Sequence, residues 1–141
     1  MTYTKRLKKD FIITTDTSLF DYNVIFDLVL GEERSKFMCN VKKKAFENSL
    51  CFGVFFKKYQ IGFMRAITDT VNFAYICDVN IKKEYQNLGI GKLAFEQMMK
   101  HPDLKYVGKW RLDTENAHGF YEHFGFHKIE DMGNCMEYLN L

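Results

Sequence analysis

The chain has 141 residues, of which 47% are hydrophobic and 27% are charged. This length predicts one domain over residues 1–141, and these fractions exclude an intrinsically disordered chain. The formal net charge of +2 is too small to indicate nucleic-acid binding. No apolar run approaches the ~18 residues that a membrane span needs, and the polar, basic start of the chain predicts no secretory signal.

Cysteines are sparse and widely spaced. The four are Cys39, Cys51, Cys77 and Cys135. None forms a C-x-x-C pair, and disulfide-linked chains usually carry denser cysteines in a shorter sequence. We therefore expect reduced thiols and a cytoplasmic location, with Cys77 packed inside a strand.

Apolar patterning in the first half of the chain predicts one strand, two helices and a meander of three strands. The first strand covers residues 11–14, and a helix over 19–29 follows with Ser18 as its N-cap. Gly31 ends that helix and Ser35 begins the next. The three meander strands are predicted over residues 50–56, 61–67 and 71–81.

In the second half, helical spacing returns over residues 90–98 until His101 and Pro102 end it. A strand over 106–112 and an amphipathic helix over 117–124 follow, and Gly125 is the natural residue beyond the helix end. Two short closing strands are predicted over residues 126–129 and 135–139. The resulting order is βααβββαβαββ. It predicts a mixed α/β fold, with a central, mostly antiparallel twisted sheet flanked by helices.

The segment between residues 78 and 92, DVNIKKEYQNLGIGK, is the most informative one. Gly89 and Gly91 allow a tight turn that exposes backbone N–H groups at a helix N-terminus, and such donors bind phosphates. The same glycines also fit an ordinary loop. A Walker A motif would need glycine at Gln86 and a hydroxyl residue at Leu93, so it is excluded.

Two readings of this glycine turn compete. The dinucleotide pattern G-x-G-x-x-A is present over residues 89–94. Asp113 follows it by about the number of residues that separates the ribose-binding acid from this pattern in dinucleotide-binding proteins. In a dinucleotide-binding fold the first glycine should follow the preceding strand directly, whereas seven residues, 82–88, separate Gly89 from the strand that ends at residue 81. The other reading is an acyl-CoA site.

Two motifs support the acyl-CoA reading and together resemble the GNAT superfamily of N-acetyltransferases. The family's central motif joins a strand end and a polar turn to [Q/R]-x-x-G-x-[G/A], which is QNLGIG at residues 86–91. Its second motif has an alanine, a tyrosine four residues later and a Gly-Phe pair, which are Ala117, Tyr121 and Gly125–Phe126. Both motifs stand in the family's order, and the predicted element order matches over nearly the whole chain.

The sequence departs from the family pattern at two positions. Gln86 stands where arginine is commoner, so one positive charge near the pyrophosphate is missing. Thr114 stands where the family usually has asparagine. Asn116, which directly precedes Ala117, is expected to take over a hydrogen bond to the cofactor arm.

The resemblance implies acetyl-CoA as acetyl donor, with no metal, and a cleft where two parallel strands separate. Carried over, Val79 and Ile81 would offer backbone groups to the pantetheine arm, and backbone N–H groups of one turn would hold the pyrophosphate. The residues implied for that turn are Gln86, Asn87, Leu88, Gly89, Ile90, Gly91 and Lys92.

The resemblance also implies direct attack by a primary amine on the thioester. Tyr121 occupies the family's general-acid position, and a phenol is suited to protonating a thiolate; alternatively it is a core aromatic. A backbone N–H near Val79 would stabilise the oxyanion. Asp78 is the candidate to bind or deprotonate the amine, and the alternative is an ion pair with Arg65 on the adjacent strand.

Several questions stay open at this stage. His118, His123 and His127 do not share one helical face, so no metal site is predicted. The acceptor is a small-molecule amine or a peptide amine, and neither nucleic acid nor membrane is expected as a partner. A homodimer is left open. The alternative functions are an acyl-CoA sensor without turnover and a protein lysine or N-terminal acetyltransferase.

Overall fold

A six-stranded sheet runs through the computed structural model, which describes residues 2–141, and its strands lie side by side in chain order. The strands are β1 (Thr4–Lys8), β2 (Phe11–Thr14), β3 (Leu50–Phe56), β4 (Tyr59–Thr68), β5 (Phe73–Ile81) and β6 (Lys109–Arg111). The helices are α1 (Tyr22–Leu30), α2 (Lys36–Glu47), α3 (Ile90–Met99) and α4 (His118–Glu122). All neighbouring strands are antiparallel except β5 and β6, which are parallel.

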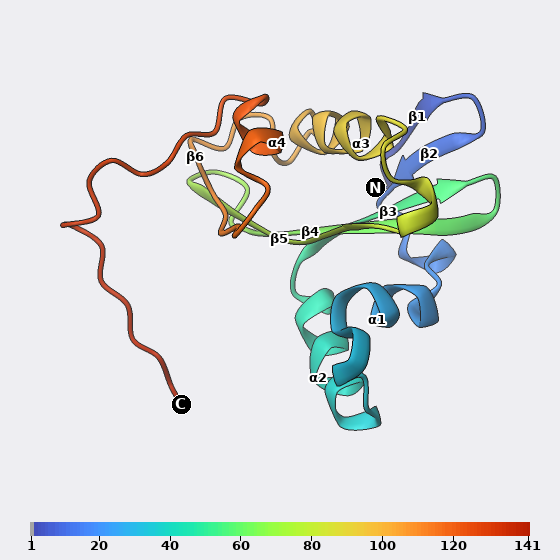
Figure 1. Ribbon diagram of the computed structural model, residues 1–141, viewed down its shortest axis with the longest axis horizontal. Helices are drawn as coiled ribbons and strands as arrows, with labels where there is room; N and C mark the ends of the chain where they lie inside the picture. The colour runs from blue at the N-terminus through green and yellow to red at the C-terminus, as the bar shows by residue number, and fades with distance from the viewer. Residues whose placement is uncertain (1) are drawn as a thin grey trace.

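Helices cover both faces of the sheet. Figure 1 shows α3 and α4 on one face and α1 with α2 on the other. The α3 face holds the larger core, in which Phe95 and Met98 pack against Phe52 of β3. The opposite face holds a second cluster, built by Ile25 of α1 and Phe63 of β4. Both faces are buried, which explains the nearly continuous apolar runs of β3 and β4.

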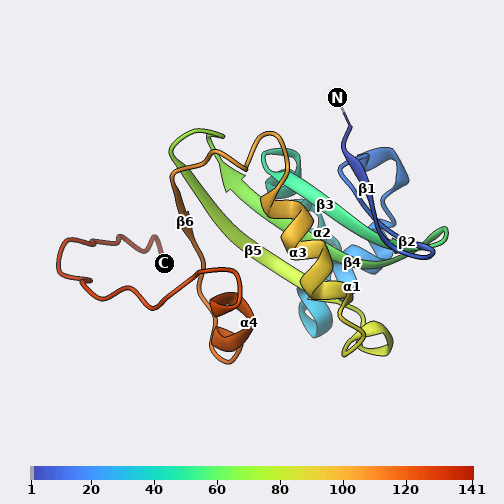
Figure 2. The same cartoon turned by 90° about the horizontal axis from the view of Figure 1, so that it is seen from above.

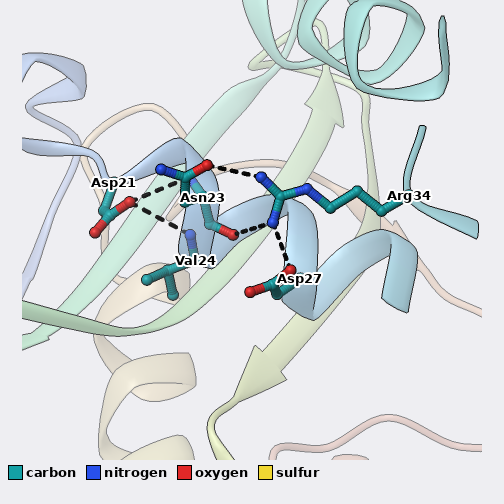
Figure 3. Close-up of polar contacts among 5 residues, drawn as sticks. All are labelled: Asp21, Asn23, Val24, Asp27 and Arg34. Carbon is teal, nitrogen blue, oxygen red and sulfur yellow. Dashed lines mark hydrogen bonds and ion pairs between the residues drawn. The ribbon is translucent and has the colours of Figure 1, made fainter. Parts of the chain in front are cut away.

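Polar side chains fix the start of α1 and the turn that follows it. The Asp21 carboxylate accepts the N–H groups of Asn23 and Val24 and so caps α1. Arg34 reaches back from beyond the helix, donating to Asp27 at 2.5 Å and to the Asn23 side chain at 2.7 Å. Figure 3 shows this guanidinium bonded to Asn23 in the first turn of α1 and to Asp27 one turn farther along.

The structure confirms the mixed, mostly antiparallel sheet but corrects its beginning. The predicted strand at residues 11–14 is β2, and β1 before it was missed because its sequence, TKRLK, is charged and mostly exposed at the sheet edge. Ser18 is not the N-cap of α1. It lies in a 3₁₀ turn capped by Asp16, and extended backbone at Phe20 delays the helix until Asp21 can cap it.

The two closing strands predicted over residues 126–129 and 135–139 are wrong. Neither segment has a backbone ladder with any strand of residues 2–141, so their β-type residues lie outside the sheet. The strand predicted over 106–112 is also shorter and is limited to β6. The helix predicted over 117–124 is also shorter, because α4 ends at Glu122 and His123 is its C-cap. Gly125 therefore lies two residues beyond the cap rather than directly after it, although its φ of 95° does turn the chain.

The turn between β4 and β5 is organised by Asp69. Its carboxylate accepts the N–H groups of Val71, Asn72 and Phe73 and the side-chain amide of Asn72. These hydrogen bonds favour the ionised form and hold the pKa of Asp69 well below its usual range. The turn therefore fixes the start of β5, the strand that carries the candidate site.

Candidate active site

β5 carries one extra residue at Asp78. Arg65 pairs with Cys77 and Phe63 pairs with Asn80, so three steps along β5 match two along β4. Asp78 has a φ of 56°, in the left-handed region that few non-glycine residues adopt. Such a bulge bends the strand and removes backbone groups from the ladder. The bend directs the second half of β5 away from β6.

β5 and β6 therefore separate and leave a cavity between them. Their ladder ends at the pair Tyr75–Arg111. Beyond it lies a cavity of about 330 Å³ that is lined by both predicted catalytic residues, Asp78 and Tyr121. The structure thus brings together two side chains that are far apart in the sequence.

A compact turn joins β5 to α3. The Gln86 side-chain amide donates to the backbone carbonyl of Ile81 at 2.8 Å and closes the turn on itself. Asn87 and Gly89 follow with φ values of 63° and 80°. The glycine ends the turn, and α3 begins at the next residue with its N–H groups unsatisfied by the helix. Gln86 therefore shapes this turn, a role the sequence did not predict for it.

A wide groove adjoins this turn. It encloses about 1010 Å³ between the end of β5, the start of α3 and α4. It is lined by eight of the predicted cofactor residues: Val79, Ile81, Gln86, Asn87, Gly89, Gly91, Lys92 and Asn116. The unsatisfied N–H groups at the start of α3 and the positive end of its dipole suit this groove to an anionic group such as a pyrophosphate.

Two predicted cofactor residues do not line the groove. Ile90 is fully buried and belongs to the core beneath α3. Leu88 is half exposed, and its backbone carbonyl accepts the Lys8 ammonium at 3.2 Å. Only the backbone N–H groups of these two residues remain candidates for the pyrophosphate.

Tyr121 borders both the groove and the cavity between β5 and β6. Its ring packs against Phe95 and Phe120, with centroids 5.4 and 5.0 Å away. Its hydroxyl has no hydrogen-bond partner within residues 2–141 and is not closed off from solvent. Burial raises the pKa of this phenol above its ordinary value, which keeps it protonated. The ring is a core aromatic and the hydroxyl is free to meet a ligand.

Asp78 forms a largely buried ion pair with Arg65. The Arg65 Nε donates to Asp78 Oδ2 at 2.8 Å, and the side chains are 9% and 16% exposed. A second guanidinium nitrogen donates to the Ser49 hydroxyl at 2.9 Å. The alternative of an ion pair is thus present in the structure, and Asp78 also lines the cavity. Ser49 had no signal in the sequence, since it lies in neither motif.

The two thiols beside this ion pair are poor nucleophiles. Burial raises the pKa of Cys51 to about 12 and also raises that of Cys77. Both stay protonated at neutral pH. An acyl-cysteine intermediate at this site is therefore disfavoured.

The groove is also lined by three residues that the sequence did not assign to cofactor binding: Gly119, Phe120 and His123. All lie within or next to the second motif, so position in that motif was the available signal. Thr114, at the family's asparagine position, accepts the Ala117 N–H at 3.1 Å and holds the start of α4. Across residues 2–141, no three acidic, histidine or cysteine side chains gather into a site that could hold a metal ion.

Comparison with known proteins places this architecture in a family. Residues 20–126 match the sequence profile of the acetyltransferase (GNAT) family. The chain therefore belongs to the GNAT acetyltransferases, and the resemblance drawn from its two motifs is confirmed. The same family implies acetyl-CoA as the donor.

Individual relatives agree with this assignment. A protein belonging to the GNAT family from Xanthomonas campestris pv. campestris is 32% identical, with a TM-score of 0.83 and 92% of each chain covered. A Staphylococcus aureus protein of unknown function shares the fold, with a TM-score of 0.71 at 24% identity over 92% of this chain and 98% of its own.

A curated relative matches only in part. The uncharacterized N-acetyltransferase ycf52 of Gracilaria tenuistipitata var. liui is 37% identical over 71 residues, which are 50% of this chain and 39% of that protein. Separately, none of the helices within residues 2–141 has the length and apolar character that crossing a membrane requires.

Proposed function

We propose that this protein transfers an acetyl group from acetyl-CoA to a primary amine by direct attack within a ternary complex. One observation carries the proposal. The groove beside α3 and the cavity beside Asp78 share four lining residues: Val79, Asn116, Ala117 and Tyr121. A donor held in the groove and an acceptor held in the cavity would therefore meet at Tyr121.

The donor end follows from the turn and the helix behind it. The pyrophosphate of CoA would accept N–H groups at the start of α3, with Lys92 adding positive charge nearby. Val79 and Ile81 line the groove farther along β5. Their backbone would hold the pantetheine arm in the space that β6 leaves open, and Asn116 would bind it from the opposite side.

The chemical step is then a direct substitution at the thioester carbonyl. The amine nitrogen bonds to the carbonyl carbon, and the carbon–sulfur bond breaks after an oxyanion forms. A backbone N–H near Val79 would stabilise that oxyanion. Tyr121 would donate its proton to the departing thiolate, and the proton lost by nitrogen would return to the phenolate through water.

Asp78 would act on the acceptor. An amine attacks only when neutral, so a carboxylate beside the cavity can bind the ammonium form and take up its proton. The Arg65 guanidinium holds this carboxylate in one orientation through its 2.8 Å hydrogen bond. The high pKa values of Cys51 and Cys77 support direct attack over a covalent enzyme intermediate.

Calorimetric titration with CoA and acetyl-CoA, followed by a thiol-release assay, tests this function. We expect both ligands to bind and thiol release to depend on an added amine. The panel would contain polyamines, aminoglycosides, amino acids and peptides with free lysine or N-terminal amines. Binding without release on any amine would favour an acyl-CoA sensor, release only with peptides would favour a protein acetyltransferase, and no binding would refute both classes.

Substitution of Gly89 should affect stability, whereas substitution of Gly91 should affect CoA binding. Gly89 has a left-handed φ of 80°, so Gly89→Ala should lower the free energy of unfolding by about 1 kcal/mol. Gly91 has ordinary backbone, and a Cβ there would lie 3.6 Å from Ile81 Cγ1, which is a normal contact. Gly91→Val should therefore keep its stability and weaken CoA binding at least tenfold, or ~1.4 kcal/mol.

Urea unfolding and calorimetric titration of the two variants check this prediction. Gly108→Val is the control, because Gly108 lies outside the groove and a Cβ there would approach only the Asn72 carbonyl, at 4.0 Å. Normal CoA affinity in a folded Gly91→Val protein would contradict the assignment of this turn to the pyrophosphate.

A further inference from the structure

Two carboxylates line the cavity between β5 and β6, one from each side. Asp78 belongs to β5, and Asp113 follows β6 by two residues, beyond the last pair of the ladder at Tyr75–Arg111. Figure 2 shows the two strands side by side near the start of β5 and apart toward its end, where α4 lies. An acceptor held in this cavity therefore meets two negative groups.

Tyr75 holds the Asp113 carboxylate at the point where the strands separate. The Tyr75 hydroxyl donates to Asp113 Oδ2 at 2.5 Å. This hydrogen bond, together with burial, raises the pKa of Tyr75 to about 12, so the phenol remains a donor at neutral pH. The other carboxylate oxygen of Asp113 accepts no hydrogen bond from residues 2–141. The carboxylate is thus oriented by β5 and keeps one oxygen for a ligand.

The negative charge of Asp113 is not balanced by a cation, whereas the charge of Asp78 is. Arg65 pairs with Asp78 at 2.8 Å, but Asp113 forms no ion pair with any basic side chain of residues 2–141. No basic side chain in this part of the chain lines the cavity. Lys42 and Arg111 lie close by, and neither lines it. The cavity therefore favours a ligand that carries positive charge.

We propose that Asp113 selects acceptors with a second positive charge, so that the preferred substrates are diamines and polyamines. One amine would lie at Asp78 and lose its proton before it attacks the thioester. The other amine would stay protonated and donate to Asp113. Both are protonated at neutral pH, because alkylamines have pKa values close to the ~10.4 of lysine.

The same arrangement disfavours other amines. An acceptor with a carboxylate at its far end would meet Asp113 with a like charge, and an alkyl monoamine would leave Asp113 without a partner. The inference rests on the proposed function and adds the substrate class to it. Tyr75 is a positioning residue in this scheme, since it acts only through the carboxylate that it holds.

Kinetics with matched acceptors provide the first test. Cadaverine and pentylamine have the same carbon chain and differ by one ammonium group, and aminohexanoate carries a carboxylate at the far end. We expect kcat/KM for cadaverine to exceed that for pentylamine about tenfold, with aminohexanoate the poorest acceptor. The ratio of cadaverine to pentylamine should fall as salt is added, because screening weakens the contact with Asp113. Equal efficiency for these two amines overturns the proposal.

Variants of the two residues provide the second test. Asp113→Asn should lower the ratio about tenfold, mainly through a higher KM for cadaverine, because a charge-assisted hydrogen bond is lost. Tyr75→Phe should lower it by a smaller factor, since the carboxylate remains but is no longer held. Each ratio is measured on one enzyme sample, so a fraction of inactive protein cancels.

Glu115→Gln is the matched control for these variants. It makes the same change of charge two residues farther along the chain, at a carboxylate that does not line the cavity, the groove or the neighbouring cavity. Its ratio should equal that of the unaltered protein. An unchanged ratio in Asp113→Asn, or an equal fall in Glu115→Gln, shows that Asp113 does not select the acceptor.

Failure of the proposed function would give a different result. If neither amine releases thiol, acetyl transfer itself is refuted, and calorimetric titration of the CoA-loaded protein still tests Asp113. Cadaverine should then bind more tightly than pentylamine, and Asp113→Asn should abolish the difference. Equal binding of the two amines would refute the role of Asp113 as well. Equal turnover of the two amines would keep the function and refute the selection.

Discussion

Replacing Tyr121 by phenylalanine should lower kcat by roughly 10²–10⁴-fold, the range for loss of a positioned general acid. The substitution keeps the ring that packs against Phe95 and Phe120. It removes only a hydroxyl that has no partner within residues 2–141. CoA affinity and the free energy of unfolding should therefore stay close to the wild-type values. Thiol-release kinetics with the best amine of the panel measure the effect.

The pH dependence of kcat gives a second signature for Tyr121. A general acid works while protonated, so the wild-type rate should fall as pH rises through the phenol pKa. Burial raises that pKa above the ordinary value of 10.0, which keeps the acid active through the neutral and mildly alkaline range. Deprotonation of the acceptor amine acts in the opposite sense and raises the rate with pH. Tyr121→Phe should lose the alkaline fall and keep the rise.

Tyr3→Phe is the matched control for this experiment. Tyr3 is also a partly buried tyrosine whose pKa is raised by burial, and it packs on His101 away from the groove. Its variant should keep full kcat and an unchanged pH profile. A Tyr121→Phe enzyme with full kcat would reduce Tyr121 to a packing residue, and proton donation would then fall to water.

Helices and strands that carry a clear pattern in their own residues were predictable from the sequence. β3 and β4 follow from two apolar runs around a polar turn, and α2 follows from the Ser35 cap and the lysines along its outer side. β1 was not predictable, because its charged residues carry no strand pattern and only pairing with β2 makes it a strand. Residues 135–139 show the reverse: the pattern indicates a strand, but a strand forms only where a partner edge is available.

The candidate site likewise contains residues that were predictable from the sequence and residues that were not. The glycine turn and Tyr121 are sequence-local, so the two motifs sufficed to find them. The Arg65–Asp78 ion pair was one of two alternatives for Asp78, and the sequence could not choose between them, because the pairing depends on a bulge that shifts the register between β4 and β5 by one residue. The contact of Arg65 with Ser49 was not predicted. A single sequence carries no record of register. Gln86 was identified correctly as part of the turn, but its hydrogen bond to Ile81 could be assigned only from the fold.

Breaking the Arg65–Asp78 ion pair should cause a large loss in the free energy of unfolding. Arg65→Met keeps most of the apolar stem over Phe46, whose ring lies 5.7 Å from the guanidinium carbon. It also leaves the Asp78 carboxylate largely buried without its cation. Removing one partner of a buried ion pair typically costs about 3–5 kcal/mol, which is a large part of the ~5–15 kcal/mol that keeps a domain folded. Urea unfolding at neutral pH measures the loss.

A double variant separates the ion pair from the packing around it. Arg65→Met with Asp78→Asn removes both charges, so most of the stability should return, because the uncompensated charge causes the loss. Arg34→Met is the exposed control. Its partner Asp27 is 70% exposed, and water can replace the lost contact, so only a small change is expected. A double variant as unstable as Arg65→Met would locate the loss in packing.

The same double variant also tests the catalytic role of Asp78, because it is expected to be folded. If Asp78 binds and deprotonates the acceptor, thiol release should stay low although stability has recovered, and raising the pH should partly restore the rate by supplying neutral amine. If Asp78 serves only the ion pair, kcat should recover together with stability. Comparing unfolding midpoints with kcat across the two variants therefore assigns the carboxylate to the chemistry or to the fold.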